Sequence, residues 1–305
     1  MLLRVRHRTE YRYAGNVLES HNELRLEPQS DDRQKLLDFK VTVEPDARVW
    51  SHTRAGGNVH HFTLREPHDR MAVTAESLVR TSLVNPYEGL NLLVPDWDVY
   101  LGDAMRWEQA EFLSASRFID PVPARELAEA AKEGQATVGT FLGELNQRIH
   151  SWLSYDPDAT HVHSTVSEVL QGRAGVCQDF AHVAIACCRA VGVPARYVSG
   201  YLYTGDDGSM RGEAATHAWA EALLPDGRWI GFDPTNNLFA NDRYVRTHIG
   251  RDYDDCAPTR GVFLGPKTQA LRVSVSVHQV SEDEVPVPVV RAPWPPSSMT
   301  HHQQQ

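Results

Sequence analysis

Apolar and polar residues alternate along much of the first 85 or so residues, which is the pattern of strands that bury one face. Alternating runs begin at Leu2 and His7, and others occupy residues 38–43, 61–64 and 78–83. Turn-forming residues separate them at 15–16, 28–30 and 56–58. This succession of short strands and turns predicts a small antiparallel β-sandwich at the N-terminus.

The hydrophobic pattern takes a helical period beyond Asp120. The prolines at positions 121 and 123 are tolerated only in a first helical turn, and the helix formers that follow predict a helix with Gly134 as its C-cap. Apolar residues spaced three and four apart predict a second helix over 138–153. A third runs from Cys177 to about Val191 with one apolar stripe, and a glycine and a proline then stop it.

Cys177 opens the third predicted helix. The N-terminus of a helix carries unpaired backbone N–H groups and the positive end of the helix dipole. Both favour a thiolate over a thiol, and the thiolate is the nucleophile in cysteine chemistry. Cys177 is therefore a candidate catalytic nucleophile.

Strands are predicted over 195–203 and 216–232, and the second run contains the turn sequence Pro225-Asp226-Gly227. This sequence suits a three-residue hairpin loop with glycine in the left-handed conformation, which sets Leu224 opposite Arg228. In that register Trp219 faces Asp233, and His217 becomes the diagonal neighbour of Asp233, about 7 Å away between backbones. The opposite face is apolar and is expected to meet the core: Ala218, Ala220, Ala222, Ile230 and Phe232.

These three residues form a candidate catalytic triad. Cys177 would attack a carbonyl carbon, His217 would keep it ionised and protonate the leaving group, and Asp233 would fix the imidazole. The backbone N–H of Cys177 is the first candidate for the oxyanion, and the N–H of Gln178 or the Tyr155 hydroxyl is the second. Trp219 and Trp229 would either line the site or pack between domains.

Composition excludes several classes of function. The net charge of −10, with no basic run, argues against nucleic-acid binding. The sequence has no stretch of about 18 apolar residues, so no membrane span is predicted. The N-terminus has the pattern of a strand and lacks the apolar core of a signal peptide. Four cysteines without framework spacing predict free thiols, and with the missing signal they predict a cytoplasmic location.

A metal site is conceivable at His161 and His163, with Asp156 or Asp158. Zinc needs three or four convergent ligands, and the sequence supplies no convincing set. The aspartates at 252, 254 and 255 do not have the spacing of an EF-hand loop. No metal and no cofactor are therefore predicted.

Four segments resemble one known family: 172–182, 200–202, 216–221 and 231–236, which read GRAGVCQDFAH, GYL, THAWAE and GFDPTN. The sequence resembles the bacterial transglutaminase-like family, and the resemblance implies a papain-like Cys-His-Asp site at Cys177, His217 and Asp233. Residues 7–13 and 22–28 are similar to the β domain that precedes this core in bacterial members. The resemblance covers about residues 1–280.

The expected fold class is α+β. It has an antiparallel β-sandwich with linker over 1–105, a transglutaminase-like domain over 106–282 and a disordered tail over 283–305. In this domain the nucleophile lies at a helix N-terminus packed on an antiparallel sheet. The expected activity is acyl transfer on peptide or protein substrates through a thioester, with hydrolysis preferred because water is always present. The alternatives are a protein-glutamine transglutaminase with an amine acceptor, and a non-catalytic peptide-binding or scaffold protein.

Overall fold

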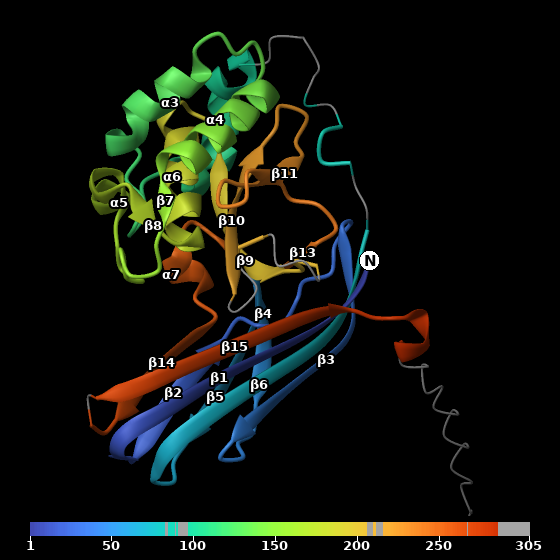
Figure 1. Cartoon of the computed structure of the whole chain (residues 1–305), viewed down its shortest axis with the longest axis vertical. Helices are drawn as coiled ribbons and strands as arrows, with labels where there is room; N and C mark the ends of the chain where they lie inside the picture. The colour runs from blue at the N-terminus through green and yellow to red at the C-terminus, as the bar shows by residue number, and fades with distance from the viewer. Residues whose placement is uncertain are drawn as a thin grey trace, which may run out of the picture.

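The chain folds into a β-sandwich and a helix-rich lobe built on a five-stranded antiparallel sheet (Figure 1). The computed structural model describes residues 1–82, 85–88, 90, 97–205, 210–211, 216–266 and 268–285. The predicted α+β class, with antiparallel sheets first and a helix-and-sheet core after them, is confirmed.

Two four-stranded antiparallel sheets form the sandwich, in the orders β15-β1-β6-β3 and β14-β2-β5-β4. Between them lies a core to which Leu24, Phe62 and Val73 belong. The strands of the first sheet are β1 (Leu2–Val17), β3 (Gln34–Glu44), β6 (His68–Thr81) and β15 (Gln269–Gln279). Those of the second are β2 (Glu19–Leu24), β4 (Trp50–Arg54), β5 (Gly57–Leu64) and β14 (Thr259–Leu264).

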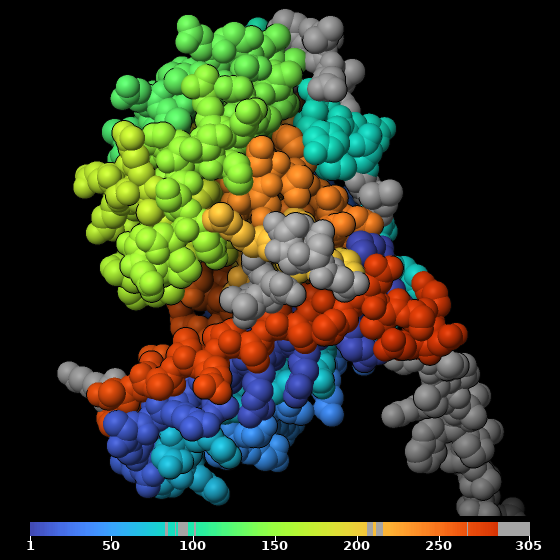
Figure 2. All heavy atoms as spheres, in the orientation of Figure 1, coloured from blue at the N-terminus to red at the C-terminus, as the bar shows by residue number. Residues whose placement is uncertain are grey.

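Two strands of the sandwich come from the other end of the chain. β15 pairs with β1 from Leu3↔Gln279 to Tyr13↔Gln269, and β14 pairs with β2. In the space-filling view β15 forms a continuous ridge along the sandwich (Figure 2). The range 106–282 assigned to the second domain thus contains two strands that complete the first, because local sequence patterns do not report pairing with distant partners.

The tail predicted to be disordered, 283–305, lies mostly outside the described residues, which end at 285. Its first residues belong to a short 3₁₀ helix, η3 (Glu282–Glu284). Ion pairs from Arg4 to Glu284 and from Arg80 to Glu282 hold η3 on the sandwich.

The sheet of the helix-rich lobe has the order β12-β11-β10-β9-β13. Its hairpin has the predicted register: Leu223 pairs with Trp229, and the N–H of Leu224 donates to Arg228 O at 2.8 Å. Gly227 has φ +87°, the left-handed conformation that the loop requires. The strands are β9 (Ala195–Leu202), β10 (His217–Leu223), β11 (Trp229–Asp233), β12 (Leu238–Phe239) and β13 (Tyr244–Gly250).

Helix α6 (Cys177–Ala190) is the centre of this lobe. It packs on β10, and α3, α4 and α5 cover its other sides, so that every residue from Gln178 to Ala190 is buried. The sequence pattern predicted a single apolar stripe, but the helix is enclosed on all sides. The other helices are η1 (Trp97–Leu101), α1 (Asp103–Glu108), α2 (Ala110–Leu113), η2 (Val122–Ala124), α3 (Arg125–Lys132), α4 (Val138–Trp152), α5 (Val166–Gly172) and α7 (Tyr253–Cys256).

The two lobes meet through an apolar cluster and a set of polar contacts. Leu3 and Val5 of β1 pack against Tyr201 of β9 in a buried cluster. Gln34 of β3 exchanges two hydrogen bonds with the backbone of Arg246 on β13, each 2.8 Å long. The sandwich therefore supports the sheet directly.

No helix among the described residues is both long and apolar enough to cross a membrane. The cytoplasmic location expected from the sequence stays a prediction.

Candidate active site

Cys177 is the first residue of α6, and the turn into the helix is held by a buried carboxylate. Strand β8 (Ala174–Gly175) leads into it and pairs in parallel with β7 (Ser154–Tyr155). Asp179 Oδ2 accepts a hydrogen bond from Val176 N at 2.8 Å and from Thr160 Oγ1 at 2.6 Å. Asp179 therefore fixes the backbone just before Cys177.

Cys177 differs from the other three cysteines in its exposure. All four are free, but Cys187, Cys188 and Cys256 are fully buried, whereas Cys177 is only half-buried. Burial raises the pKa of the thiols of these three buried residues. They are packing residues, and Cys177 is the thiol that a reagent can reach.

The predicted partners of Cys177 lie side by side on the hairpin. His217 Nε2 and Asp233 Oδ2 are 2.8 Å apart, and both side chains are fully buried. The other ring nitrogen of His217, Nδ1, is buried and has no hydrogen-bond partner within the described part of the chain. With Nε2 held by Asp233, Nδ1 is the atom left for the thiol.

Asp233 is satisfied on both oxygens. Oδ2 accepts further hydrogen bonds from Asn236 Nδ2 at 2.8 Å and from Tyr244 Oη at 2.9 Å, and Oδ1 accepts from Thr235 N at 2.9 Å. A buried carboxylate with this many donors is held as an anion. Sequence reasoning missed Tyr244 and gave Asn236 no role, although Asn236 closes one of the quoted motifs.

The surroundings of His217 and Asp233 favour the charged form of each side chain. Burial of the imidazole opposes its charged form, but the charge and hydrogen bond of Asp233, together with Cys177, outweigh burial and raise the pKa of His217 to about 10. Burial would raise the pKa of Asp233, but His217, Asn236 and Tyr244 hold it below its ordinary value. The site therefore favours an imidazolium beside a carboxylate.

Aromatic rings enclose the imidazole. The ring of Trp219 stacks on His217 at 6.2 Å between centroids, and Tyr244 lies 6.1 Å from His217 and 5.2 Å from Trp219. Gly200 on β9 makes room, because a Cβ there would lie 2.7 Å from the Trp219 ring and 2.1 Å from Val245 O. Trp219 is thus a wall that keeps water from one side of His217.

The remaining predicted site residues take different positions. Tyr155 pairs with Gly175, two residues before Cys177, and is half-buried. The Gln178 side chain turns away, and its Nε2 donates to Val162 O at 3.2 Å. Trp229, weighed with Trp219 as a wall, instead lies under the Arg196 guanidinium at 4.0 Å.

The histidine pair considered as a metal site has its ring centroids 6.2 Å apart, at His161 and His163. Among the described residues, no group of three or more potential ligands converges there or elsewhere.

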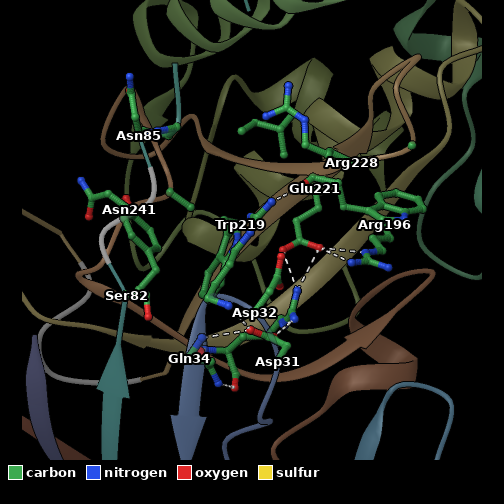
Figure 3. Close-up of a pocket in the computed structure, with 18 residues that line it drawn as sticks. Asp31, Asp32, Gln34, Ser82, Asn85, Arg196, Trp219, Glu221, Arg228 and Asn241 are labelled. Carbon is green, nitrogen blue, oxygen red and sulfur yellow. Dashed lines mark hydrogen bonds and ion pairs between the residues drawn. The ribbon is translucent and has the colours of Figure 1, made fainter. Parts of the chain in front are cut away.

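A cavity of about 360 Å³ lies behind the aromatic wall, between the sandwich and the sheet (Figure 3). Trp219 and Tyr244 line it, and Cys177 does not. Four of its charged groups pair with one another: Glu221, fully buried, contacts Arg196 at 2.6 Å and Arg246 at 3.1 Å, and Arg246 also contacts Asp31. We read this cavity as part of the junction between the lobes and place the candidate chemistry at Cys177.

A thiol at the mouth of a central helix, beside an imidazole and a carboxylate on an antiparallel sheet, defines a core of the transglutaminase and cysteine-protease type. The comparisons agree. The transglutaminase-like superfamily matches residues 125–234, and the bacterial transglutaminase-like N-terminal region matches residues 3–80. The chain belongs to the bacterial transglutaminase-like family.

Its relatives include an uncharacterized protein of Mycobacterium tuberculosis, 38% identical over 291 residues, which cover 90% of this chain and 91% of that protein. A protein-glutamine gamma-glutamyltransferase of Pseudomonas aeruginosa is 30% identical over 116 residues, 37% of this chain and 17% of that protein. Among solved structures, a candidate cysteine protease from Cytophaga hutchinsonii shares the fold with a TM-score of 0.73 and 22% identity, over 92% of both chains.

Proposed function

We propose that this protein is a cysteine-dependent acyl-transfer enzyme that cleaves peptide or amide bonds through a thioester on Cys177. The observation that carries the proposal is the buried His217–Asp233 pair, because the imidazole held by Asp233 also interacts with Cys177, whose hydrogen bond and charge help to raise the pKa of His217. A buried ion pair of this kind adds little to stability by itself, so its presence beside an accessible thiol favours a catalytic role.

The reaction has two halves. The Cys177 thiolate attacks the carbonyl carbon, and the C–N bond then breaks as His217 Nδ1 gives its proton to the leaving amine. In the second half His217 takes a proton from water, the hydroxide oxygen attacks the thioester carbon, and the C–S bond breaks. The acid leaves, and the thiolate and imidazolium are restored. Asp233 holds the imidazole through both halves.

The oxyanion of each tetrahedral intermediate requires donors. The backbone N–H of Cys177, at the start of α6, is the first we propose, because the first N–H groups of a helix have no partner within it. The Gln178 N–H, or the Tyr155 hydroxyl, would supply the second. The side-chain amide of Gln178 is bound to Val162 and is not proposed for this role.

An amine in place of water as the acceptor would make the enzyme a transglutaminase. The Pseudomonas aeruginosa relative, described as a protein-glutamine gamma-glutamyltransferase, supports this second candidate over the matched segment. Both candidates share the thioester and differ only in the second half-reaction. We favour hydrolysis because water is always available.

Mass spectrometry of the intact protein and of its Cys177 peptide, after incubation with a mixture of cellular peptides, tests the proposal. We expect acyl adducts on Cys177 that hydroxylamine removes, and we expect none in the His217→Ala variant. Product acids without added amine indicate hydrolysis, and amine conjugates after addition of a primary amine indicate transfer. If Cys177 carries no adduct and reacts with iodoacetamide as slowly as the three buried thiols, the protein is a non-catalytic module.

A further inference from the structure

The segment Met210–Arg211 is fixed to the candidate site through Asn236. The N–H of Arg211 donates to Asn236 Oδ1 at 2.9 Å, and Asn236 Nδ2 donates to Arg211 O at 3.1 Å. The same Nδ2 group donates to Asp233 Oδ2 at 2.8 Å. One amide side chain thus joins the backbone of Arg211 to the carboxylate that holds His217.

Met210 gives the segment a second anchor. Its side chain packs against the buried cluster that contains Trp219 and Tyr244, and its sulfur accepts a contact from Arg243 Nη1 at 3.7 Å. The position of the Arg211 backbone is therefore set by its hydrogen bonds to Asn236 and by the packing of Met210. The Arg211 side chain takes part in neither of these contacts.

The Arg211 side chain is free to reach across the site. Its guanidinium carbon lies 4.7 Å from the centroid of the Tyr155 ring, in a cation–π contact. Tyr155 belongs to the opposite wall, since it pairs with Gly175 just before Cys177, and its ring contacts Phe180, one turn into α6, at 6.4 Å. Arg211 thus bridges the sheet side and the helix side of the site beside the nucleophile.

Among the residues that the structure describes, the guanidinium of Arg211 forms no ion pair. Arg211 is exposed, and within the described residues no carboxylate oxygen lies within 4.0 Å of it. Two arginines of the cavity behind Trp219 differ, because Arg196 and Arg246 both pair with Glu221 and Arg246 also pairs with Asp31. An arginine that is positioned by its backbone and left unpaired can offer its donors to a ligand.

We propose that Arg211 forms a subsite that binds a carboxylate of the acyl substrate next to the bond that Cys177 attacks. This proposal rests on the proposed function and names its substrate class: peptides with an acidic side chain, or with a free terminal carboxylate, at that position. Arg211 would orient the substrate through a charge-assisted hydrogen bond while its aliphatic stem and guanidinium plane rest on Tyr155.

Alkylation of Cys177 by an anionic and a neutral reagent tests the subsite without a known substrate. Iodoacetate and iodoacetamide deliver nearly the same group to sulfur, so the ratio of their rate constants at Cys177 isolates the effect of the negative charge. Coulomb attraction between unit charges about 6 Å apart in solvent-exposed surroundings corresponds to a preference of about three- to tenfold, and we expect a preference of this order for the anionic reagent. We expect this ratio to fall by that factor in Arg211→Gln and to be largely kept in Arg211→Lys.

The matched control is Arg48→Gln, because Arg48 is also exposed and also lies over an aromatic ring, Trp50 at 3.7 Å, but in the sandwich. Its ratio should equal that of the wild type. An unchanged ratio in Arg211→Gln overturns the subsite while leaving the nucleophile intact. If neither reagent labels Cys177, the proposed function fails, and the subsite fails with it.

Protection experiments identify the source of the carboxylate. Three blocked glycine-based tripeptides are compared as inhibitors of Cys177 labelling: one with a free C-terminus, one amidated with a central glutamate, and one amidated with a central glutamine. We expect one carboxylate peptide to protect best, and the Arg211→Gln variant to lose that preference. Equal protection by all three in the wild type contradicts the subsite.

Discussion

Replacing Tyr244 by phenylalanine removes one hydroxyl and tests how Asp233 is held. Tyr244 Oη donates to Asp233 Oδ2 at 2.9 Å, and both side chains are buried. The phenylalanine ring fills the same space, so the change leaves no cavity and acts through the lost hydrogen bond. Asp233 keeps its bonds to His217, Asn236 and Thr235 N.

The expected cost follows from the charge of the acceptor. A hydrogen bond to a charged group contributes about 1.5–3 kcal/mol to the free energy of unfolding, whereas a hydrogen bond between neutral groups contributes about 0.5–1.5 kcal/mol. The hydroxyl also lowers the pKa of Asp233 in the folded state. A depressed carboxyl pKa contributes stability that is full above the unfolded pKa, about 4, and is lost as the pH falls through the folded pKa. The decrease in the free energy of unfolding caused by Tyr244→Phe should therefore be largest near pH 7 and should become smaller below about pH 4.

Urea unfolding of the wild type and variant across this pH range measures the loss. Tyr201→Phe is the matched control: Tyr201 is fully buried, and its Oη lies 3.1 Å from Nδ1 of His7. Burial lowers the pKa of His7 to about 4, so His7 is neutral at pH 7 and the control bond is a neutral one. The prediction is refuted if Tyr244→Phe lowers the free energy of unfolding no more than Tyr201→Phe does at neutral pH. It is also refuted if the decrease for Tyr244→Phe is as large at acid pH as at pH 7.

Three further predictions concern the site. Cys177→Ala should keep the unfolding midpoint close to that of the wild type and abolish turnover; residual activity above background would remove Cys177 as nucleophile. Because the imidazolium of His217 is present below its raised pKa of about 10 and lost above it, kcat/KM should fall on the alkaline side near pH 10. Asp233→Asn should move that fall to lower pH, and a profile that does not move would contradict the role of the pair. Gly200→Ala places a Cβ 2.1 Å from a backbone oxygen and should lower the free energy of unfolding by about 1–3 kcal/mol in urea titrations; a neutral result would show that the strand can shift.

The hairpin could be predicted in detail because the residues that determine its register are neighbours in the sequence. Pro225, Asp226 and Gly227 select one loop type, and the loop fixes the register of the strands on either side. That register places His217 beside Asp233 before any tertiary contact is known. The start of the nucleophile helix was also local, since the apolar period begins at Cys177.

The support around the site could not be predicted in the same way. Tyr244 belongs to β13, which pairs with β9 and not with the hairpin strand that carries Asp233. No short-range pattern reports that its hydroxyl reaches the carboxylate. The clamp between Asn236 and Arg211 is likewise a contact between segments 25 positions apart that share no strand pairing. Such contacts depend on the finished packing.

The return of β14 and β15 to the sandwich has a consequence for biosynthesis. A ribosome makes β1 and β2 first, and their outer edges stay uncovered until residues 259–279 emerge. Open strand edges invite pairing with other chains, so the nascent protein carries this hazard while its helix-rich lobe takes shape. The last strands therefore complete both sheets. A chain cut at residue 258 would keep every side chain of the candidate site, but one edge of β1 and one edge of β2 would stay unpaired in the sandwich that supports it.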